Sequence, residues 1–292
     1  MKKIELKKIL FCMIALWTFD LSAEENRLDQ MISPVFHPVT FEDPRAISEA
    51  RFLYVYHELD NDFVTEGGNA QVYALQLRYA LTDKLSLIAT KDGYVDFNPK
   101  ANVPKNTGFA DIEAGLKYTL FEDREKGYIV SSQLRYLIPI GEKEVFQGQG
   151  DGVIHPSFSG AVALCESSTI TAGTGLRIPI SDHDSSFWDV DVQLDYRIPV
   201  SEDIAIYPIV GASLIKVTSS GDRLGISDEG QDFFNFGATE SAGKNIVTGI
   251  GGLRARISSN VDIGGSYQFP LDTSAGSKVI NNRWLFDATY KF

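Results

Sequence analysis

Apolar and polar residues alternate with a period of two along much of the chain, as in β-strands that have one apolar face. The pattern is clearest over residues 187–199. One face of that segment carries Trp188, Val190, Val192, Leu194, Tyr196 and Ile198. The opposite face carries Asp189, Asp191, Gln193, Asp195 and Arg197. We predict twelve such strands, at residues 47–58, 70–81, 85–97, 108–121, 127–139, 153–165, 169–180, 187–199, 204–217, 245–257, 261–271 and 281–292.

The length of these segments favours strands that cross a membrane. Each has ten or more residues. Strands of soluble proteins average about 5–6 residues, whereas a strand that crosses the hydrocarbon obliquely needs about 9–11. The alternation alone also fits a soluble sandwich, which buries its apolar face in a core, whereas a membrane barrel turns that face towards lipid.

Connection lengths separate the two folds. Short connections follow every second predicted strand, at residues 82–84, 122–126, 166–168, 201–203 and 258–260. The other connections are mostly longer, and the longest runs from Val217 to Lys244. Short periplasmic turns and longer outer loops produce this pattern, with both termini in the periplasm. The sequence therefore predicts an all-β fold: a transmembrane up-and-down antiparallel β-barrel of outer-membrane type, about twelve strands, over residues 47–292.

The last predicted strand places aromatic residues on one face and ends on one. Its outward face carries Trp284, Phe286, Ala288, Tyr290 and Phe292. The segment resembles the C-terminal β-signal of outer-membrane barrels, an amphipathic strand closing on Phe that the outer-membrane assembly machinery reads. The resemblance implies that Tyr290 and Phe292 form an assembly signal and that this machinery is a partner. A soluble edge strand is the alternative.

The start of the chain has the pattern of a secretory signal peptide over residues 1–23. Four lysines precede the apolar run 9–17, which is too short to span a bilayer, and Ser22 and Ala23 offer small residues for cleavage. Residues 24–46 show no clear period and hold three prolines. We expect this N-terminal segment to stay on the periplasmic side or to enter the barrel mouth. The predicted location is the cell outer membrane, with lipid against the apolar face.

Charge and cysteine content narrow the function classes. Removing residues 1–23, with four lysines and two acidic residues, changes the formal net charge from −12 to −14. A surface so acidic makes nucleic acid an implausible partner. Cys165 is the one cysteine after residue 23, so we expect no intrachain disulfide. The histidines are scattered, and no zinc spacing, phosphate loop or dinucleotide fingerprint occurs, so we predict no metal or other cofactor.

Charged residues of both signs fall on the predicted inward face of the strands. The candidates for lining the lumen are Arg78, Glu113, Lys117, Arg135, Arg177, Asp189, Asp191, Asp195, Arg197, Arg283 and Asp287. In an open lumen they would set ion selectivity; in a narrow one they would pair and fill the interior. The sequence does not decide between a conducting lumen and a filled one. Asp189, Asp191 and Asp195 share one face, and Arg177 and Arg197 are available partners for an acid–base ladder.

Two stretches in the middle of the chain carry a family resemblance. They are Gly108-Phe109-Ala110-Asp111-Ile112-Glu113-Ala114-Gly115-Leu116-Lys117-Tyr118 and Leu134-Arg135-Tyr136-Leu137-Ile138-Pro139-Ile140-Gly141. They resemble the family of the MetA pathway of phenol degradation, a set of outer-membrane transporters, although Ile140 stands where that family has Thr. The family is similar to the long-chain fatty acid and toluene channels. The resemblance implies uptake of small hydrophobic or aromatic compounds.

Two other functions compete with transport. A structural or surface-exposed barrel would have the same fold and no passage. A remote alternative is an outer-membrane phospholipase or esterase, because His155 and Ser157 lie two residues apart on one strand and therefore share a face. That enzyme family has Asn after its Ser, where this chain has Phe158. The register turns His155 and Ser157 towards the lumen, so we predict that the protein is not an enzyme and has no catalytic residue.

Overall fold

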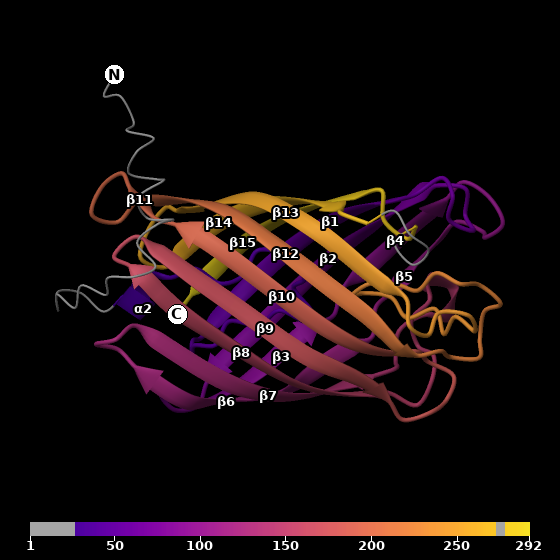
Figure 1. Ribbon diagram of the computed structural model, residues 1–292, viewed down its shortest axis with the longest axis horizontal. Coiled ribbons are helices and arrows are strands. Elements are labelled where there is room, and N and C mark those ends of the chain that lie inside the picture. Colours follow the sequence, from indigo (N-terminus) through magenta and orange to yellow (C-terminus); the bar gives the residue numbers. More distant parts are fainter. Residues whose placement is uncertain (1–26, 273–277) are drawn as a thin grey trace, which may run out of the picture.

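In the described part of the chain, fifteen strands form one antiparallel sheet that closes on itself (Figure 1). The computed structural model describes residues 27–272 and 278–292, so the predicted signal peptide lies outside the described residues. The strands are β1 Glu49–Leu59, β2 Gly68–Ala80, β3 Leu85–Lys91, β4 Tyr94–Pro99, β5 Asn106–Phe109, β6 Ile112–Asp123, β7 Tyr128–Ile138, β8 Val153–Cys165, β9 Ser168–Pro179, β10 Ser186–Tyr196, β11 Ile198–Pro199, β12 Ala205–Ser219, β13 Asn245–Arg256, β14 Val261–Pro270 and β15 Asn282–Lys291.

Pairing of the first strand closes the barrel. β1 pairs with β15 on one side and with β2 on the other, and the crossings between them follow the order of the chain once interrupted strands are joined. Three successive pairs of strands, β3 with β4, β5 with β6 and β10 with β11, are parts of one crossing each. The wall therefore has twelve crossings, which confirms the predicted closed barrel and its strand number.

The third crossing breaks at Asp92 and Gly93 for a local reason. Gly93 has a φ of +113°, and a Cβ atom there would lie 2.3 Å from the carbonyl oxygen of Tyr73 on β2. Only glycine fits this close approach. The carboxylate of Asp92 accepts a hydrogen bond of 3.0 Å from the amide of Leu75, and the Ala110 amide donates to the Gly93 carbonyl at 2.8 Å. These bonds satisfy backbone groups that the interrupted ladder leaves unpaired.

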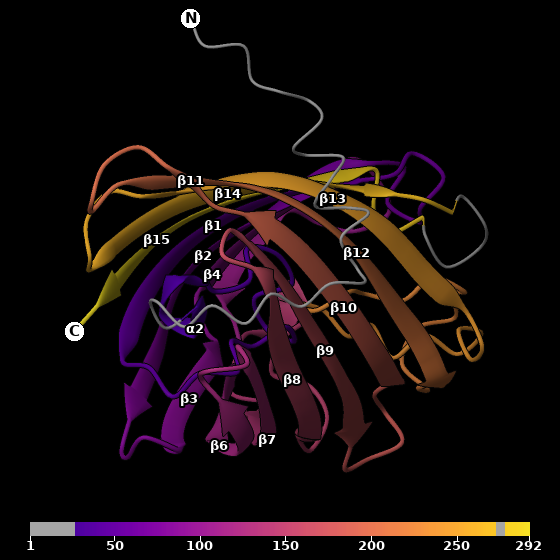
Figure 2. The same cartoon turned by 60° about the vertical axis from the view of Figure 1, so that its left-hand side comes forward.

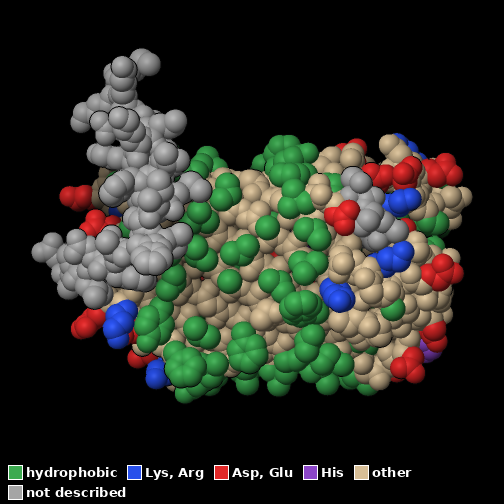
Figure 3. Space-filling view, in the orientation of Figure 1, with side chains coloured by type: hydrophobic (Ala, Val, Ile, Leu, Met, Phe, Trp, Pro, Cys, Tyr) green, Lys and Arg blue, Asp and Glu red, His purple; other side chains and the backbone are tan. Residues whose placement is uncertain are grey.

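The two faces of each strand distinguish this barrel from a soluble sandwich. On β10, Asp189, Asp191 and Asp195 are buried, whereas Trp188 and Val192 are exposed. The apolar face thus points outwards, as in a barrel surrounded by lipid. Hydrophobic side chains spread over the outer wall, while most charged side chains lie towards its two ends (Figure 3).

The connections define the two ends of the barrel. Short turns lie at one end, the turn end, together with the short helix α2 (Arg27–Gln30) and the last strand's C-terminus (Figures 1 and 2). Longer connections lie at the opposite end, the loop end, with the 3₁₀ turn η1 (Lys143–Val145) and the connection between β12 and β13. Within residues 27–272 and 278–292, no helix has the length and hydropathy of a membrane span.

Candidate functional site

The inward face of the barrel gathers the charged residues that were predicted to line the lumen. Ten of the eleven are buried: Arg78, Glu113, Lys117, Arg135, Arg177, Asp189, Asp191, Asp195, Arg283 and Asp287. Arg197 is half-buried near the turn end, where its amide donates a 2.6 Å hydrogen bond to the carbonyl of Ser167. Arg254, also buried, pairs with Asp287, and so does Arg51. Tyr290 and Phe292 are exposed on the outside.

The lumen is filled from the turn end by the segment before β1. Residues 31–44 are buried without interruption, although they contain no strand and only α2 precedes them. Of the two places expected for this segment from the sequence, the periplasm and the barrel mouth, these residues occupy the inside of the barrel. We call residues 31–44 the N-terminal plug.

A carboxylate of the N-terminal plug joins two basic residues of the wall. The Arg78 guanidinium donates hydrogen bonds of 2.8–3.1 Å to both carboxylate oxygens of Glu42, and the Lys117 ammonium lies 3.0 Å from Oε1. Burial by itself raises the pKa of this carboxyl, but the charges of Arg78 and Lys117 lower the pKa of Glu42 from 4.5 to about 2. Glu42 is therefore ionised and held between β2 and β6.

A second polar cluster holds the middle of the N-terminal plug. His37 Nδ1 lies 2.9 Å from a carboxylate oxygen of Asp191 and 3.0 Å from the hydroxyl of Ser213. Its other ring nitrogen lies 2.6 Å from the side-chain amide nitrogen of Gln268. The Thr40 hydroxyl donates to the second oxygen of Asp191 at 3.4 Å. One plug histidine thus contacts residues of β10, β12 and β14.

Wall side chains also satisfy the backbone of the N-terminal plug. Arg254 donates to the Ser33 carbonyl at 2.6 Å, Ser266 to the Val35 carbonyl at 3.0 Å, and Gln76 to the Pro38 carbonyl at 2.8 Å. Buried backbone groups without a partner are costly, and an irregular segment cannot pair them internally. Side chains of the wall therefore provide the hydrogen bonds that a neighbouring strand would provide to the backbone of a strand.

Two inward-facing glycines make room for plug aromatics. A Cβ atom on Gly173 would lie 2.9 Å from the Phe41 ring, and one on Gly211 would lie 2.7 Å from the Phe36 ring. These rings contact each other at 5.2 Å between centroids. The wall is shaped around the plug, so the plug occupies a defined position and is not a loosely placed tail.

The lumen is filled from the loop end by part of the β12–β13 connection. Residues 228–238, which we call the loop plug, are buried except for Asn235. Arg283 lies 2.6 Å from the Asp232 carboxylate, and Arg177 donates to the Gln231 carbonyl at 2.7 Å. Burial by itself raises the pKa of Asp232, but the positive charge of Arg283 lowers it from 3.8 to about 2.

The loop plug is organised internally by one carboxylate. Glu229 accepts hydrogen bonds from the amides of Gly230 at 2.8 Å and Ala238 at 2.9 Å, and also from the Phe236 amide. The Ser185 hydroxyl donates to the same carboxylate at 2.7 Å. Charge-assisted hydrogen bonds of this kind are short and strong, and they gather the loop plug around one carboxylate.

The expected acid–base ladder on β9 and β10 takes a different form. Arg177 binds Asp189 through two hydrogen bonds of 2.8 and 3.0 Å, as anticipated. Asp191 pairs instead with His37 of the N-terminal plug, and Asp195 is buried on the same face. Arg197 lies near the turn end, where its amide binds the Ser167 carbonyl, and it takes no part in the pairing of Asp189 or Asp191. The plug, which showed no periodicity, supplies the partner that the strand pattern could not indicate.

His155 and Ser157 face the lumen, and each is engaged by the wall. Both lie 3.0 Å from a guanidinium nitrogen of Arg135. The Ser157 hydroxyl also donates to the side chain of Gln133 at 2.8 Å, and His155 Nδ1 lies 3.3 Å from Glu113. The serine hydroxyl is thus directed to an amide and not to the histidine. Within residues 27–272 and 278–292, no cluster of three or more histidine, cysteine or acidic residues is placed to hold a metal.

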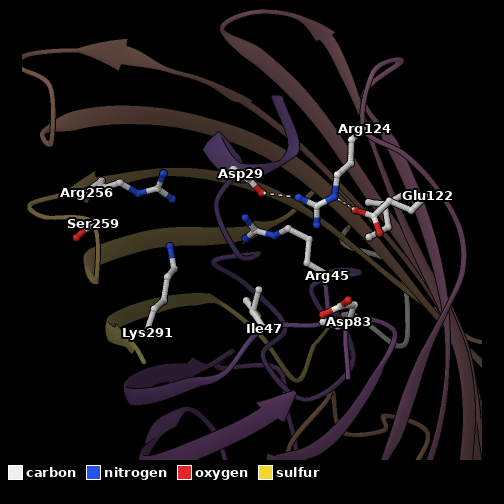
Figure 4. Close-up of a pocket in the computed structure, with 11 residues that line it drawn as sticks. Asp29, Arg45, Ile47, Asp83, Glu122, Arg124, Arg256, Ser259 and Lys291 are labelled. Carbon is white, nitrogen blue, oxygen red and sulfur yellow. Dashed lines mark hydrogen bonds and ion pairs between the residues drawn. The ribbon is translucent and has the colours of Figure 1, made fainter. Parts of the chain in front are cut away.

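A vestibule at the turn end leads to the N-terminal plug. A cavity of about 200 Å³ is lined there by Arg45, Asp83, Lys291 and neighbouring residues (Figure 4). Arg124 crosses its edge, 3.4 Å from Asp29 and 2.5 Å from Glu122. A second cavity of about 380 Å³ shares Asp29, Arg256 and Ser259 with it. Charges of both signs line this end.

Comparison with known proteins places the fold. The sequence profile of the outer membrane protein beta-barrel domain family matches residues 155–292. No curated protein matches the sequence. The structure is similar to an outer-membrane channel from Pseudomonas putida F1, with 16% identity and a TM-score of 0.55 over 90% of this chain and 100% of that chain. It is also similar to the NanC porin, with 8% identity and a TM-score of 0.51 over 84% of this chain and 100% of that chain.

These similarities establish the fold of an outer-membrane β-barrel, of the kind found in channels and porins. Family profile and fold together indicate an outer-membrane location. The identities are low, so the relatives contribute the architecture alone, and the lumen of this chain must be interpreted from its own residues.

Proposed function

We propose that this protein is a gated outer-membrane channel for the uptake of small hydrophobic or aromatic compounds, and that the structure is its closed state. One observation carries the proposal: the lumen is filled by the two plugs, which are not part of the wall. Removing either plug from the lumen would break no pairing between the twelve crossings. The wall can therefore persist while its filling changes.

The interactions of the plugs favour reversible binding. Ion pairs and carbonyl contacts attach them to the wall, as Glu42 and Asp232 illustrate, alongside apolar packing such as that of Phe36 near Tyr207 and Ile209. Ion pairs exchange for water more readily than a packed apolar core does, because charged groups recover their hydration on release. A barrel of about twelve crossings, without the plugs, is wider than the filled eight-stranded case.

The substrate class rests on two lines of support. The stretches around Asp111 and Tyr136 resemble the MetA-pathway transporters, and the loop plug brings Phe233, Phe234 and Phe236 to the loop end. We place the loop end outside the cell and the turn end in the periplasm, because barrels of this type have short periplasmic turns. Solutes would then meet the phenylalanines first and leave through the charged vestibule.

Uptake by cells tests the channel and its substrate class together. Cells that lack the protein should take up limiting toluene or phenol more slowly than complemented cells, with unchanged uptake of a hydrophilic sugar. Purified protein in planar bilayers should show brief openings. Equal aromatic uptake with and without the protein would contradict the substrate class, and a complete lack of openings under all conditions would contradict the channel.

The filled lumen also favours a second function, a structural barrel without transport. In that case the plugs are a permanent core. Protein lacking residues 31–44 would then either fail to assemble or remain impermeable. The phospholipase alternative gains no such support, because His155 and Ser157 are buried in the lumen and contact Arg135.

A further inference from the structure

A cavity of about 150 Å³ lies at the loop end, apart from the vestibule and the ion pairs described above. Its walls come from the β1–β2, β4–β5 and β7–β8 connections, from β4, from the segment that leads into the loop plug and from Phe236 of the loop plug itself. The lining residues are Phe63, Val64, Thr65, Phe97, Val103, Phe146, Leu224, Gly225, Ile226 and Phe236. Only Thr65 among them has a polar side chain, and none is charged.

Four phenylalanines give the cavity its shape. Phe63 stacks on Phe236 at 5.8 Å between centroids, and Phe146 meets Phe236 edge-on at 5.1 Å and Phe97 edge-on at 5.3 Å. Phe146 adopts a left-handed backbone conformation, with φ 58° and ψ 34°, at the end of η1. A bulky residue rarely adopts this conformation, so the surrounding structure holds the ring in place.

The cavity opens towards solvent at the loop end. Phe63, Phe97 and Phe236 are buried, whereas Val64 and Gly225 are exposed at its rim. A Cβ atom on Gly225 would meet no other atom within 4 Å, so the rim is not closed there. A solute can therefore reach the phenylalanines without passing either plug.

We propose that this cavity is a binding site for one small uncharged ring of the size of benzene or toluene. An engineered apolar cavity of about 150 Å³ lined by Leu, Ile and Phe is known to bind benzene. Ring edges and faces offer favourable contacts to a second aromatic ring. A carboxylate or ammonium ligand would have to leave water without a charged partner, which excludes ionised solutes. The inference rests on the proposed function for its role, as the first site on the uptake path.

Binding of fluorobenzene to the full-length protein in lipid nanodiscs tests the site by fluorine NMR, without any transport step. Wild-type protein should show a saturable bound component that toluene displaces, and 4-fluorobenzoate should show none. Val103→Trp, which fills the cavity, and Ile226→Asp, which places a charge in its wall, should each weaken binding at least tenfold. Val200→Trp, at an exposed position in a turn-end connection, is the matched control and should bind as wild type does.

Heat-modifiable gel migration shows that each variant is folded, and Ile226→Asp keeps the test decisive if Val103→Trp does not assemble. Equal binding by all variants, equal binding of 4-fluorobenzoate, or a lipid chain occupying the site and excluding fluorobenzene would overturn the proposal. Saturable binding at this cavity with no aromatic uptake by cells would instead contradict the proposed transport and leave the site intact.

Discussion

At the residue scale, the acids that hold the two plugs predict a pH-dependent closure. The pKa of Glu42 is lowered from 4.5, and that of Asp232 from 3.8, each to about 2. A lowered pKa in the closed state means that pairing stabilises closure fully above pH 4.5 and loses this contribution as pH falls towards 2. We therefore expect open probability in planar bilayers to rise as pH falls through this window.

Glu42→Gln is the matched variant for this prediction. It removes the carboxylate that Arg78 and Lys117 share and leaves Arg78 with Glu49, 3.5 Å away. Breaking a buried pair typically costs about 3–5 kcal/mol. The variant should open more often at pH 7 and depend less on pH than wild type. Constant wild-type open probability from pH 7 to 2.5 would show that these pairs do not control closure.

The glycine at the Phe41 contact gives a second prediction at this scale. Gly173→Ala would place a Cβ atom 2.9 Å from the Phe41 ring, with the nearest backbone atom, the Phe158 carbonyl oxygen, at 3.7 Å. Overpacking costs typically about 1–3 kcal/mol, and here it opposes docking of the N-terminal plug. We expect a higher open probability in bilayer recordings.

A double-mutant comparison isolates that contact. Gly173→Ala should have a smaller effect in a Phe41→Ala background, since the clashing ring is gone. Gly251→Ala, where an added Cβ meets nothing within 4 Å, should behave as wild type. If Gly173→Ala raised the open probability equally in both backgrounds, its effect would not come from the contact with Phe41.

Sequence alternation identified the wall residues of this network but not their plug partners. Arg78, Lys117 and Asp191 were accessible to prediction because each lies on a strand with a period of two. Glu42 and His37 lie in an irregular segment, where no period indicates a side-chain direction. Their partners are distant in the chain, 36 residues for Glu42 and Arg78, and local pattern carries no information about such contacts.

At the element scale, the predicted strand ranges correspond closely to the twelve crossings, because a strand that spans lipid must keep its alternation throughout. The interruptions at Gly93 and between Phe109 and Ile112 were not predicted. A break of this kind depends on how closely the neighbouring strand approaches, as the Tyr73 carbonyl does at Gly93. That distance is not encoded within the segment itself.

The prediction at the element scale concerns the last strand, β15, and its role in assembly. Phe292 is exposed at the end of the chain, directly after β15, and its side chain stacks with Tyr290 at 6.3 Å between centroids. If this strand is the assembly signal, deleting Phe292 should reduce the outer-membrane level severalfold and leave unfolded protein for periplasmic proteases. Immunoblots of membrane fractions measure both.

The control for this deletion is a change elsewhere on the outer wall. Phe158→Ala removes an exposed aromatic from β8, far from the terminus, and should leave the level unchanged. Normal abundance and heat-modifiable migration of the Phe292 deletion would argue that Phe292 is an ordinary lipid-facing residue.

At the scale of the whole molecule, connection lengths predicted what alternation left open. The short turns gather at one end and the long loops at the other, which a barrel requires and a sandwich does not. Whether the lumen was open was not predictable. The filling comes from two segments without periodicity that enter from opposite ends, and their position depends on the shape of a wall that exists only after closure.

The final prediction concerns the conductance of the barrel after one or both plugs are removed or weakened. Deleting residues 31–44 removes Glu42 from Arg78 and Lys117 and the Ser33 carbonyl from Arg254, while every strand pairing remains available. The barrel should still migrate heat-modifiably. Its conductance should rise only modestly, because Asp232 and the phenylalanines of the loop plug still occupy the loop end. Adding Asp232→Asn weakens the contact to Arg283, so the combined variant should conduct most, and Asp232→Asn alone should conduct little.

This order of conductances follows from two obstructions in series, since current through a single path is limited by whichever segment remains. A full opening by the deletion alone would mean that the loop plug is displaced with the N-terminal plug. Impermeable but folded protein in the combined variant would mean that the remaining wall side chains, such as the Arg135–Glu113 pair, close the lumen themselves. In that case the interior is a core, and function must lie on the outer surface of the loop end.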